Sequence, residues 1–233
     1  MAGNAVVDTS GGIGNSGVLK LTVNAAGQQG AFFINDFAGG IAVTNFKVVA
    51  RLAIGGGTAR PADGMAFAFG TDIPAPPNTF GEEGVGTGIN VTFDTWDNNG
   101  DDTAPAIDVR YLGSILAFQS MATNGGSQTF REGARPAAGP VLTDSAGMPV
   151  SLQTLPPAVA PTDGSFVNLV IEFFGDNTLS VSFSNVVVFD HLPISGYTPI
   201  SGGTFAFGAR TGGATEDVWF DNMSVFANFT PGP

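Results

Sequence analysis

The feature that most constrains this chain is a hydrophobic alternation with a period of two residues. Successive side chains of a β-strand point to opposite faces, so this alternation predicts strands with one buried face. The pattern is clear in 18–23, 46–52 and 65–69, and glycine-containing segments separate these runs. Further alternating runs occupy 89–96, 106–112, 166–174, 179–189, 204–210 and 218–226. The sequence therefore predicts strands along most of its length.

The turns and the missing helical pattern indicate how these strands pair. Asp176 and Asn177 lie between two alternating runs, and such residues tolerate the backbone angles of a hairpin turn. No stretch shows apolar residues at helical spacing, and the chain contains 34 Gly and only 12% charged residues. We therefore expect an all-β fold, a two-sheet antiparallel sandwich with negligible helix.

Length and composition favour one domain over 1–233. The chain has 233 residues and 43% hydrophobic content, which is enough for a sizeable core, and sandwiches of this size commonly form one domain. The segment 131–164 is rich in proline and glycine, so it cannot pair as a central strand. We expect it to make a long excursion over the surface, and we assign it no role.

The charge balance excludes some partners. Eight Lys and Arg stand against 20 Asp and Glu, a formal charge of −12, which would repel nucleic acid and suit neutral glycans and cations. There are no cysteines, so a disulfide framework and a thiolate metal site are excluded. No apolar run has the length of a signal peptide or a membrane span, and we expect no membrane insertion.

A cluster of oxygen-bearing side chains follows the run that begins at Ile89. Calcium takes six to eight oxygen ligands from carboxylates, amides and backbone carbonyls. Asp94, Asn98 and one of Asp101 or Asp102 could supply side-chain oxygens, and Trp96 could supply its carbonyl. The alternative is an acidic, solvated turn, since Asp, Asn and Gly are ordinary turn residues. The cluster has neither the flanking helices nor the twelfth-position Glu of an EF-hand.

Three motifs in this order give the chain a family resemblance. They are PADGMAFAF at 61–69, VTFDTWDNNG at 91–100 followed by PAID at 105–108, and FGARTGGATEDV at 207–218. Together they resemble the legume-type (L-type) lectins, and they are most similar to the animal leguminous-type cargo lectins and bacterial relatives. The resemblance implies a concanavalin-like jelly roll that binds Ca²⁺ and carbohydrate.

The resemblance also implies roles for single residues. Asp63 matches the family Asp that accepts hydrogen bonds from two sugar hydroxyls, and that Asp follows a cis peptide bond, here Ala62–Asp63. Asn98 matches the Asn that binds calcium through its carbonyl oxygen and donates its amide to the sugar. Gly212 and Gly213 match glycines whose missing side chains let backbone N–H groups approach the ligand, although a simple turn would also explain them.

Departures from the family pattern limit the metal site. Thr92 stands where legume lectins carry a Glu, and no His lies between Asp101 and Asp108, so the adjacent transition-metal site is expected to be absent. The segment 121–126 lacks the acid that supplies a further calcium ligand in the animal branch. Asp101, Asp102 or Asn124 could substitute, and the sequence does not choose between them.

The two tryptophans and the single histidine have competing interpretations. Trp96 is expected either to stack on a sugar or to pack in the core, and for Trp219 core packing is favoured. His191 is expected to be a turn residue, because no catalytic constellation can be recognised around it.

The resulting prediction is a calcium-assisted carbohydrate-binding (lectin-like) module that is extracellular or at the cell surface and is not an enzyme. One alternative is a structural or adhesive subunit that self-associates as a homo-oligomer, favoured by the low charge and high glycine content. A second is a jelly-roll glycoside hydrolase or polysaccharide lyase. Hydrolysis needs two carboxylates flanking the scissile bond, and a lyase would want a Tyr and His pair. Candidate groups are scattered along the chain: Glu82, Glu83, Tyr111, Glu132, Glu172, His191, Tyr197 and Glu216.

Overall fold

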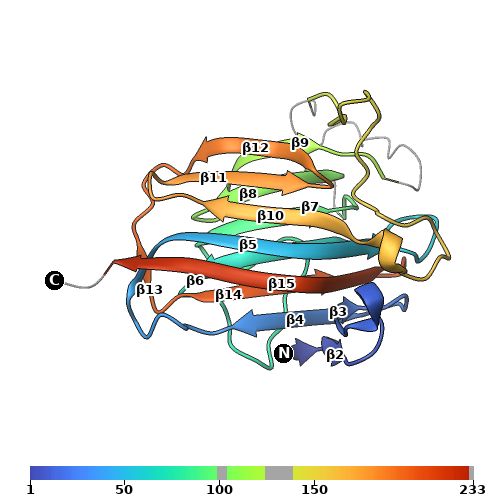
Figure 1. The fold of residues 1–233 in the computed structure, drawn as a ribbon, viewed down its shortest axis with the longest axis horizontal. Helices are drawn as coiled ribbons and strands as arrows, with labels where there is room; N and C mark the ends of the chain where they lie inside the picture. The colour runs from blue at the N-terminus through green and yellow to red at the C-terminus, as the bar shows by residue number, and fades with distance from the viewer. Residues whose placement is uncertain (99–103, 124–138, 231–233) are drawn as a thin grey trace.

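The structure, a computed structural model, consists of two antiparallel β-sheets packed face to face (Figure 1). It describes residues 1–98, 104–123 and 139–230. Helix within these ranges is confined to two short 3₁₀ segments, η1 (Ile13–Asn15) and η2 (Asp163–Ser165). The predicted two-sheet antiparallel sandwich is confirmed. No helix in the described ranges is long and apolar enough to cross a membrane.

One sheet has seven strands and forms the back layer in Figure 1. In spatial order they are β1 (Ala2–Gly3), β4 (Gln29–Ile34), β14 (Thr204–Arg210), β6 (Gly64–Gly70), β7 (Ile89–Asp94), β8 (Ala106–Tyr111) and β9 (Ser114–Ser120). The three central strands β14, β6 and β7 come from the three motifs that carry the family resemblance.

The second sheet forms the front layer and is built around two long strands. Its order is β12 (Val186–Pro193), β11 (Thr178–Phe183), β10 (Val167–Phe173), β5 (Ala42–Gly55), β15 (Asp217–Thr230), β3 (Val18–Thr22) and β2 (Val6–Asp8), with β13 (Ile200–Ser201) paired to β5. The hairpin predicted at Asp176 and Asn177 joins β10 to β11, and Asn177 has a φ of 62°.

Two parts of the strand pattern differ from the expectation. The run 179–189 is two strands, because Ser184 and Asn185 adopt φ values of 53° and 64° and turn the chain back on itself. Consecutive positive φ values are typical of tight hairpin turns. Strands β4 and β9 were not expected, because β9 is only partly buried and the apolar residues of β4 are consecutive instead of alternating.

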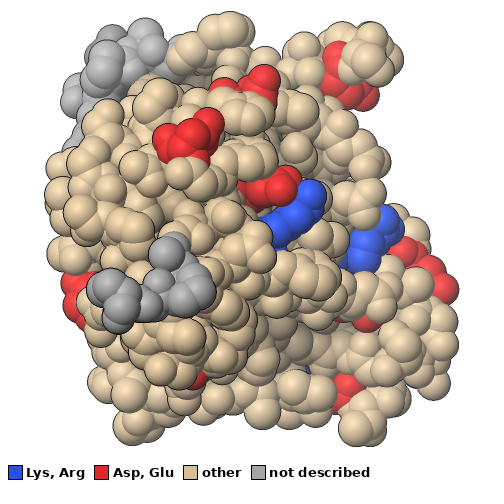
Figure 2. Space-filling model, turned by 60° about the vertical axis from the view of Figure 1, so that its left-hand side comes forward, with Lys and Arg blue, Asp and Glu red and all other residues tan. Residues whose placement is uncertain are grey.

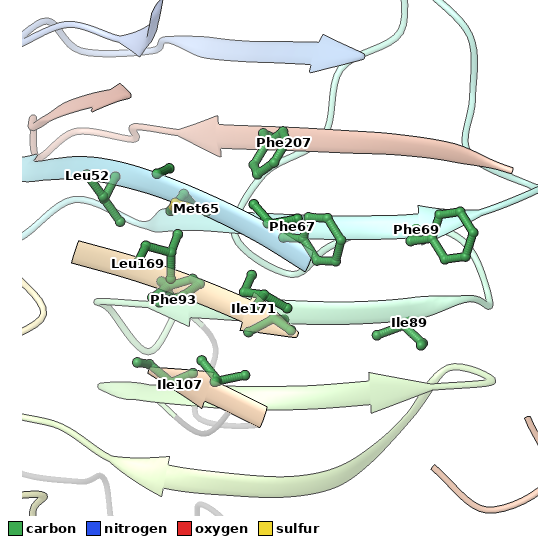
Figure 3. Packing of buried hydrophobic residues seen from close by; sticks show 14 of the residues in the cluster. Leu52, Met65, Phe67, Phe69, Ile89, Phe93, Ile107, Leu169, Ile171 and Phe207 are labelled. Atoms are coloured by element: carbon green, nitrogen blue, oxygen red, sulfur yellow. The ribbon is translucent and has the colours of Figure 1, made fainter. Parts of the chain in front are cut away.

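Aromatic side chains fill the space between the sheets. Phe46 from β5 lies with its ring centroid 5.8 Å from that of Phe67, 5.2 Å from that of Phe69 and 5.3 Å from that of Phe205, all in the opposite sheet. Aliphatic residues from both layers extend this cluster, as Leu169 and Ile171 show in Figure 3. Burial of such large apolar side chains is the dominant favourable term in folding.

The proline-rich segment, expected to run over the surface, sends apolar side chains inward over its described part. Val150, Leu152 and Leu155 are buried, and Leu155 forms a parallel bridge with Gly55 at the end of β5. Thr154 donates its backbone N–H to the Ile54 carbonyl at 2.7 Å. This segment therefore packs against the end of β5 that leads toward the candidate site.

Candidate functional site

A pocket of about 460 Å³ lies at the end of the seven-stranded sheet where β14 and β7 finish and β6 begins. The antiparallel register pairs Gly64 with both Asp94 and Arg210, so the loop before β6 and the loops after β7 and β14 meet at one place. The lining residues are Thr58, Arg60, Pro61, Asp63, Trp96, Asn98, Arg210, Gly212, Gly213 and Ala214.

All five residues predicted to bind carbohydrate line this pocket: Asp63, Trp96, Asn98, Gly212 and Gly213. They lie on three loops that are distant in sequence, and the strand register brings them together. A Cβ atom added to Gly212 would lie 3.3 Å from Asp63 Oδ2, whereas one on Gly213 would meet nothing within 4 Å. Glycine at position 212 therefore keeps the space beside the Asp63 carboxylate open.

Asp63 is the carboxylate that lines the pocket. Asp63 is 7% exposed, and its Oδ2 lies 3.2 Å from Nε of Arg210. Burial raises the pKa of Asp63, while the positive charge of Arg210 and a hydrogen bond from Asn98 act in the opposite direction. The Asp63 carbonyl accepts a hydrogen bond from the Thr95 N–H at 3.1 Å, which ties the loop before β6 to the loop after β7.

The expected cis peptide at Ala62–Asp63 is wrong. The cis bonds among the described residues are Pro76–Pro77 and Ala104–Pro105, and the Ala62–Asp63 bond is trans. The trans form is the lower in energy for a bond that does not precede proline.

Glu82 and Arg210 belong to the site but were not predicted. Arg210 Nε donates to Glu82 Oε2 at 3.1 Å, and its Nη2 donates to Glu82 Oε1. Asn98 Nδ2 also donates to Glu82 Oε1, at 3.0 Å. Glu82 is 1% exposed, so burial raises its pKa, and the charge of Arg210 opposes that shift. A buried carboxylate requires such partners, but the sequence does not say which residues supply them.

Arg60 covers one face of Trp96. Its Cζ lies 3.4 Å from the centroid of the indole ring, the geometry of a cation–π contact. Trp96 therefore lies at the pocket, as stacking on a sugar would require. The face of its ring that Arg60 covers, however, is occupied by a guanidinium.

The other two residues with competing interpretations lie away from the pocket. Trp219 donates its Nε1–H to the Thr22 carbonyl at 3.2 Å and lies under the Lys20 ammonium, so the packing interpretation fits it. His191 lies in β12 instead of a turn, with a φ of 49°, and its ring stacks on Phe174. An irregularity in the pairing of β11 with β12 at this point accommodates that backbone angle.

The residues predicted to bind calcium are only partly described. Asp94 ends β7 with its side chain buried, and its Oδ1 accepts a hydrogen bond from the Trp96 N–H at 3.1 Å. Asn98 follows on the same loop, whereas Asp101, Asp102 and the alternative Asn124 lie outside the described residues. Over the described ranges, no group of three or more His, Cys, Asp or Glu is placed to hold a metal ion. The donors Asp94, Asn98 and the Trp96 carbonyl are oxygen ligands of the kind calcium takes.

Glu216 lies beneath the same loops and is fully buried. Its Oε1 is 3.3 Å from Thr95 Oγ1, and that hydroxyl also donates to the Ala62 carbonyl at 2.8 Å. Burial raises the pKa of Glu216 to about 8. The carboxyl group is therefore mostly protonated at neutral pH.

Comparison with solved structures identifies the fold, while no protein-family model and no curated sequence matches the chain. The chain is similar to the exoplasmic/lumenal domain of VIP36 in its Ca²⁺/Man₃GlcNAc-bound form, with 14% identity, a TM-score of 0.58 and coverage of 99% of this chain and 84% of that one. It is similar to the carbohydrate recognition domain of Emp47p, with 14% identity, a TM-score of 0.60 and coverage of 97% and 87%. It is also similar to arcelin-5, a lectin-like defense protein from Phaseolus vulgaris, with 15% identity, a TM-score of 0.57 and coverage of 98% and 92%.

These similarities extend over nearly the whole chain, and at such identities they establish the architecture and not the chemistry of the site. The sandwich has the fold of the L-type lectin domains, as the three sequence motifs indicated.

Proposed function

We propose that this protein is a calcium-assisted carbohydrate-binding module that recognises glycan hydroxyls without catalysis. The observation that carries the proposal is that Asp63, Asn98, Gly212 and Gly213 line one pocket in a chain with the L-type lectin fold. The similar VIP36 domain was solved with Ca²⁺ and Man₃GlcNAc bound, which supports the same class of ligand here.

The pocket offers both acceptors and donors to a sugar. The Asp63 carboxylate accepts hydrogen bonds from hydroxyl groups, and its pairing with Arg210 holds it in place. Gly212 leaves room for a ring to approach that carboxylate. Small, well-placed polar groups of this kind determine orientation in ligand pockets.

Calcium would be held by Asp94, Asn98 and the Trp96 carbonyl, together with Asp101 or Asp102. When bound, it would fix the loop that carries Trp96 and Asn98 against the end of β7. Asn98 would then serve both ligands, because its side-chain carbonyl oxygen would coordinate the cation and its amide nitrogen would donate to a sugar hydroxyl.

The acids near the pocket do not form a hydrolytic pair. Glu82 already binds Arg210 and Asn98 through its carboxylate, and Glu216 is fully buried, so neither can flank a glycosidic bond beside Asp63. Glu132 lies outside the described residues. We infer a binding protein, and the exoplasmic/lumenal origin of the VIP36 domain supports an extracellular or cell-surface location.

Self-association remains a second candidate function. Phe226 and Val187 on the eight-stranded sheet are 60% and 57% exposed. The side of the molecule in Figure 2 is covered mainly by residues other than Lys, Arg, Asp and Glu, and the basic groups seen there lie beside acidic ones. An adhesive subunit would use such a surface, and sedimentation of the purified protein at increasing concentration tests this alternative.

Replacing Asp63 tests the proposed function. Asp63→Ala should abolish retention on a glycan array in calcium, because two charge-assisted hydrogen bonds of roughly 1.5 to 3 kcal/mol each would be lost. The fold should persist, since Arg210 keeps its contact with Glu82. Asp190→Ala is the matched control, because Asp190 is exposed and pairs with its neighbour His191. Unchanged glycan retention by Asp63→Ala would exclude this site and favour the adhesive subunit.

A further inference from the structure

Arg60 differs in its surroundings from Arg210 and from Arg110. Arg210 pairs with Glu82 and Asp63, and Arg110 pairs with Asp108 and Glu83. Arg60 is exposed and forms no ion pair with any described residue. A guanidinium that pairs with no acid of the described ranges, in the wall of a binding pocket, is available to a ligand.

The Trp96 ring holds this guanidinium over its face. The Cζ atom of Arg60 lies 3.4 Å from the centroid of the indole ring. Stacking uses the faces of the guanidinium and leaves its N–H donors, which lie in the plane, free for hydrogen bonds. The Thr58 hydroxyl donates to the Arg60 carbonyl at 2.6 Å and fixes the backbone from which the side chain extends.

Among the described residues of this site, Arg60 is the guanidinium that no carboxylate pairs with, whereas Arg210 is taken up by Asp63 and Glu82. The lining includes two guanidinium groups, Arg60 and Arg210, and one carboxylate, Asp63, in a chain whose formal charge is −12. Arg210 shares its charge between Asp63 and Glu82, and the positive charge of Arg60 also acts at Asp63, where it lowers the pKa. The repulsion by distant acids is screened beyond about 8 Å at physiological ionic strength.

We propose that the ligand of this site is a glycan bearing a carboxylate, such as a uronic acid residue, and that Arg60 binds this group. This inference rests on the proposed carbohydrate-binding function and names its ligand class. The planar fork of a guanidinium matches the two oxygens of a carboxylate, a pairing that the Arg210–Glu82 contact already shows in this pocket. Trp96 is then a positioning residue for Arg60, and its covered face does not stack on the sugar.

The test compares uronic acid oligosaccharides with their own methyl esters, which have the same ring hydroxyls but no charge. Titration in a fixed calcium concentration should show that the parent binds the acid at least about tenfold more tightly than the ester, as expected for a charge-assisted pair. Arg60→Gln should lose this preference and bind the acid no more tightly than the ester, because its amide carries no charge. Arg60→Lys should keep part of the preference, because it retains the charge but not the fork.

The outcomes separate this inference from the proposed function. If the parent binds neutral glycans but does not distinguish any acid from its ester, the carboxylate assignment is overturned and the lectin function stands. If a sulfated sugar binds as tightly as the uronate to both the parent and Arg60→Lys, the site recognises negative charge and not the carboxylate group. The carboxylate assignment is then also overturned. If the parent retains no glycan at all, the proposed function fails with it. The melting temperature of Arg60→Gln should lie close to that of the parent, because the exposed side chain loses only its contact with Trp96, worth about 0.5 to 1 kcal/mol at an exposed site.

Discussion

Glu216 is a single residue that couples the pH of the solution to the stability of the pocket loops. It is fully buried and lies 3.3 Å from Thr95 Oγ1. Its pKa rises from the 4.5 of an ordinary glutamate to about 8, because burial disfavours the charged form. Between these two values the folded state holds one proton that the unfolded state has released, so stability falls as the pH rises through this window.

Replacing this carboxyl group by an amide should remove that pH dependence. In the parent, Glu216 is expected to reduce the free energy of unfolding by up to about 1.4 kcal/mol for each pH unit between pH 5 and pH 8. The amide of Glu216→Gln does not titrate. The free energy of unfolding of the parent should therefore fall relative to that of this variant as the pH rises. Urea unfolding of both proteins at several pH values measures the difference. Parallel pH profiles would show that Glu216 is not protonated in the folded state.

At the scale of elements, the close contact between two loops forms one wall of the pocket. The Thr58 N–H donates to the Thr215 carbonyl at 3.0 Å, and the Thr215 N–H donates to Thr58 Oγ1 at 2.9 Å. Gly57 lies so near that a Cβ atom on it would be 1.8 Å from the Thr215 carbonyl oxygen. The loop that carries Arg60 and the loop that follows Gly213 are thus held together by backbone contacts.

A methyl group at position 57 should separate these loops. Gly57→Ala is expected to lower the free energy of unfolding by about 1 to 3 kcal/mol, as overpacking against rigid backbone does, and to weaken glycan binding. Gly164→Ala is the matched control, because a Cβ atom there meets nothing within 4 Å. Thermal unfolding and glycan-array retention measure both effects. Equal melting temperatures for the two variants would mean that the contact at Gly57 yields without cost.

At the scale of the whole molecule, calcium should raise the stability of the sandwich. A ligand that binds only the native state adds about 2.7 kcal/mol at a hundredfold excess over its dissociation constant. A chelator should therefore lower the melting temperature of the parent and of Asp63→Ala. Asn98→Ala should show a smaller calcium effect, because it lacks a proposed ligand. A parent protein whose melting temperature is the same with calcium and with chelator would contradict an occupied native site.

The sequence by itself determined the architecture, because alternation with a period of two specifies a strand with one buried face wherever it occurs. It also indicated the pocket residues, because Asp63, Asn98, Gly212 and Gly213 lie in motifs that a known family shares. Alternation alone did not reveal that 179–189 is a hairpin, since Val187 and Phe189 keep the phase of the apolar residues that precede the polar pair Ser184 and Asn185.

Only the tertiary structure decided which partners the charged groups of the site take. Glu82 and Arg210 are 128 positions apart in the chain, and they meet because the loop after β6 lies along β14, with Phe80 against Gly208 and Gly81 against Arg210. The contact of Arg60 with Trp96 follows from the register of β6 with β7, which brings the loops at Gly64 and Asp94 together. Spacing along the chain encodes which face of a strand a residue occupies, but long-range register determines which loops meet and therefore which charges become neighbours.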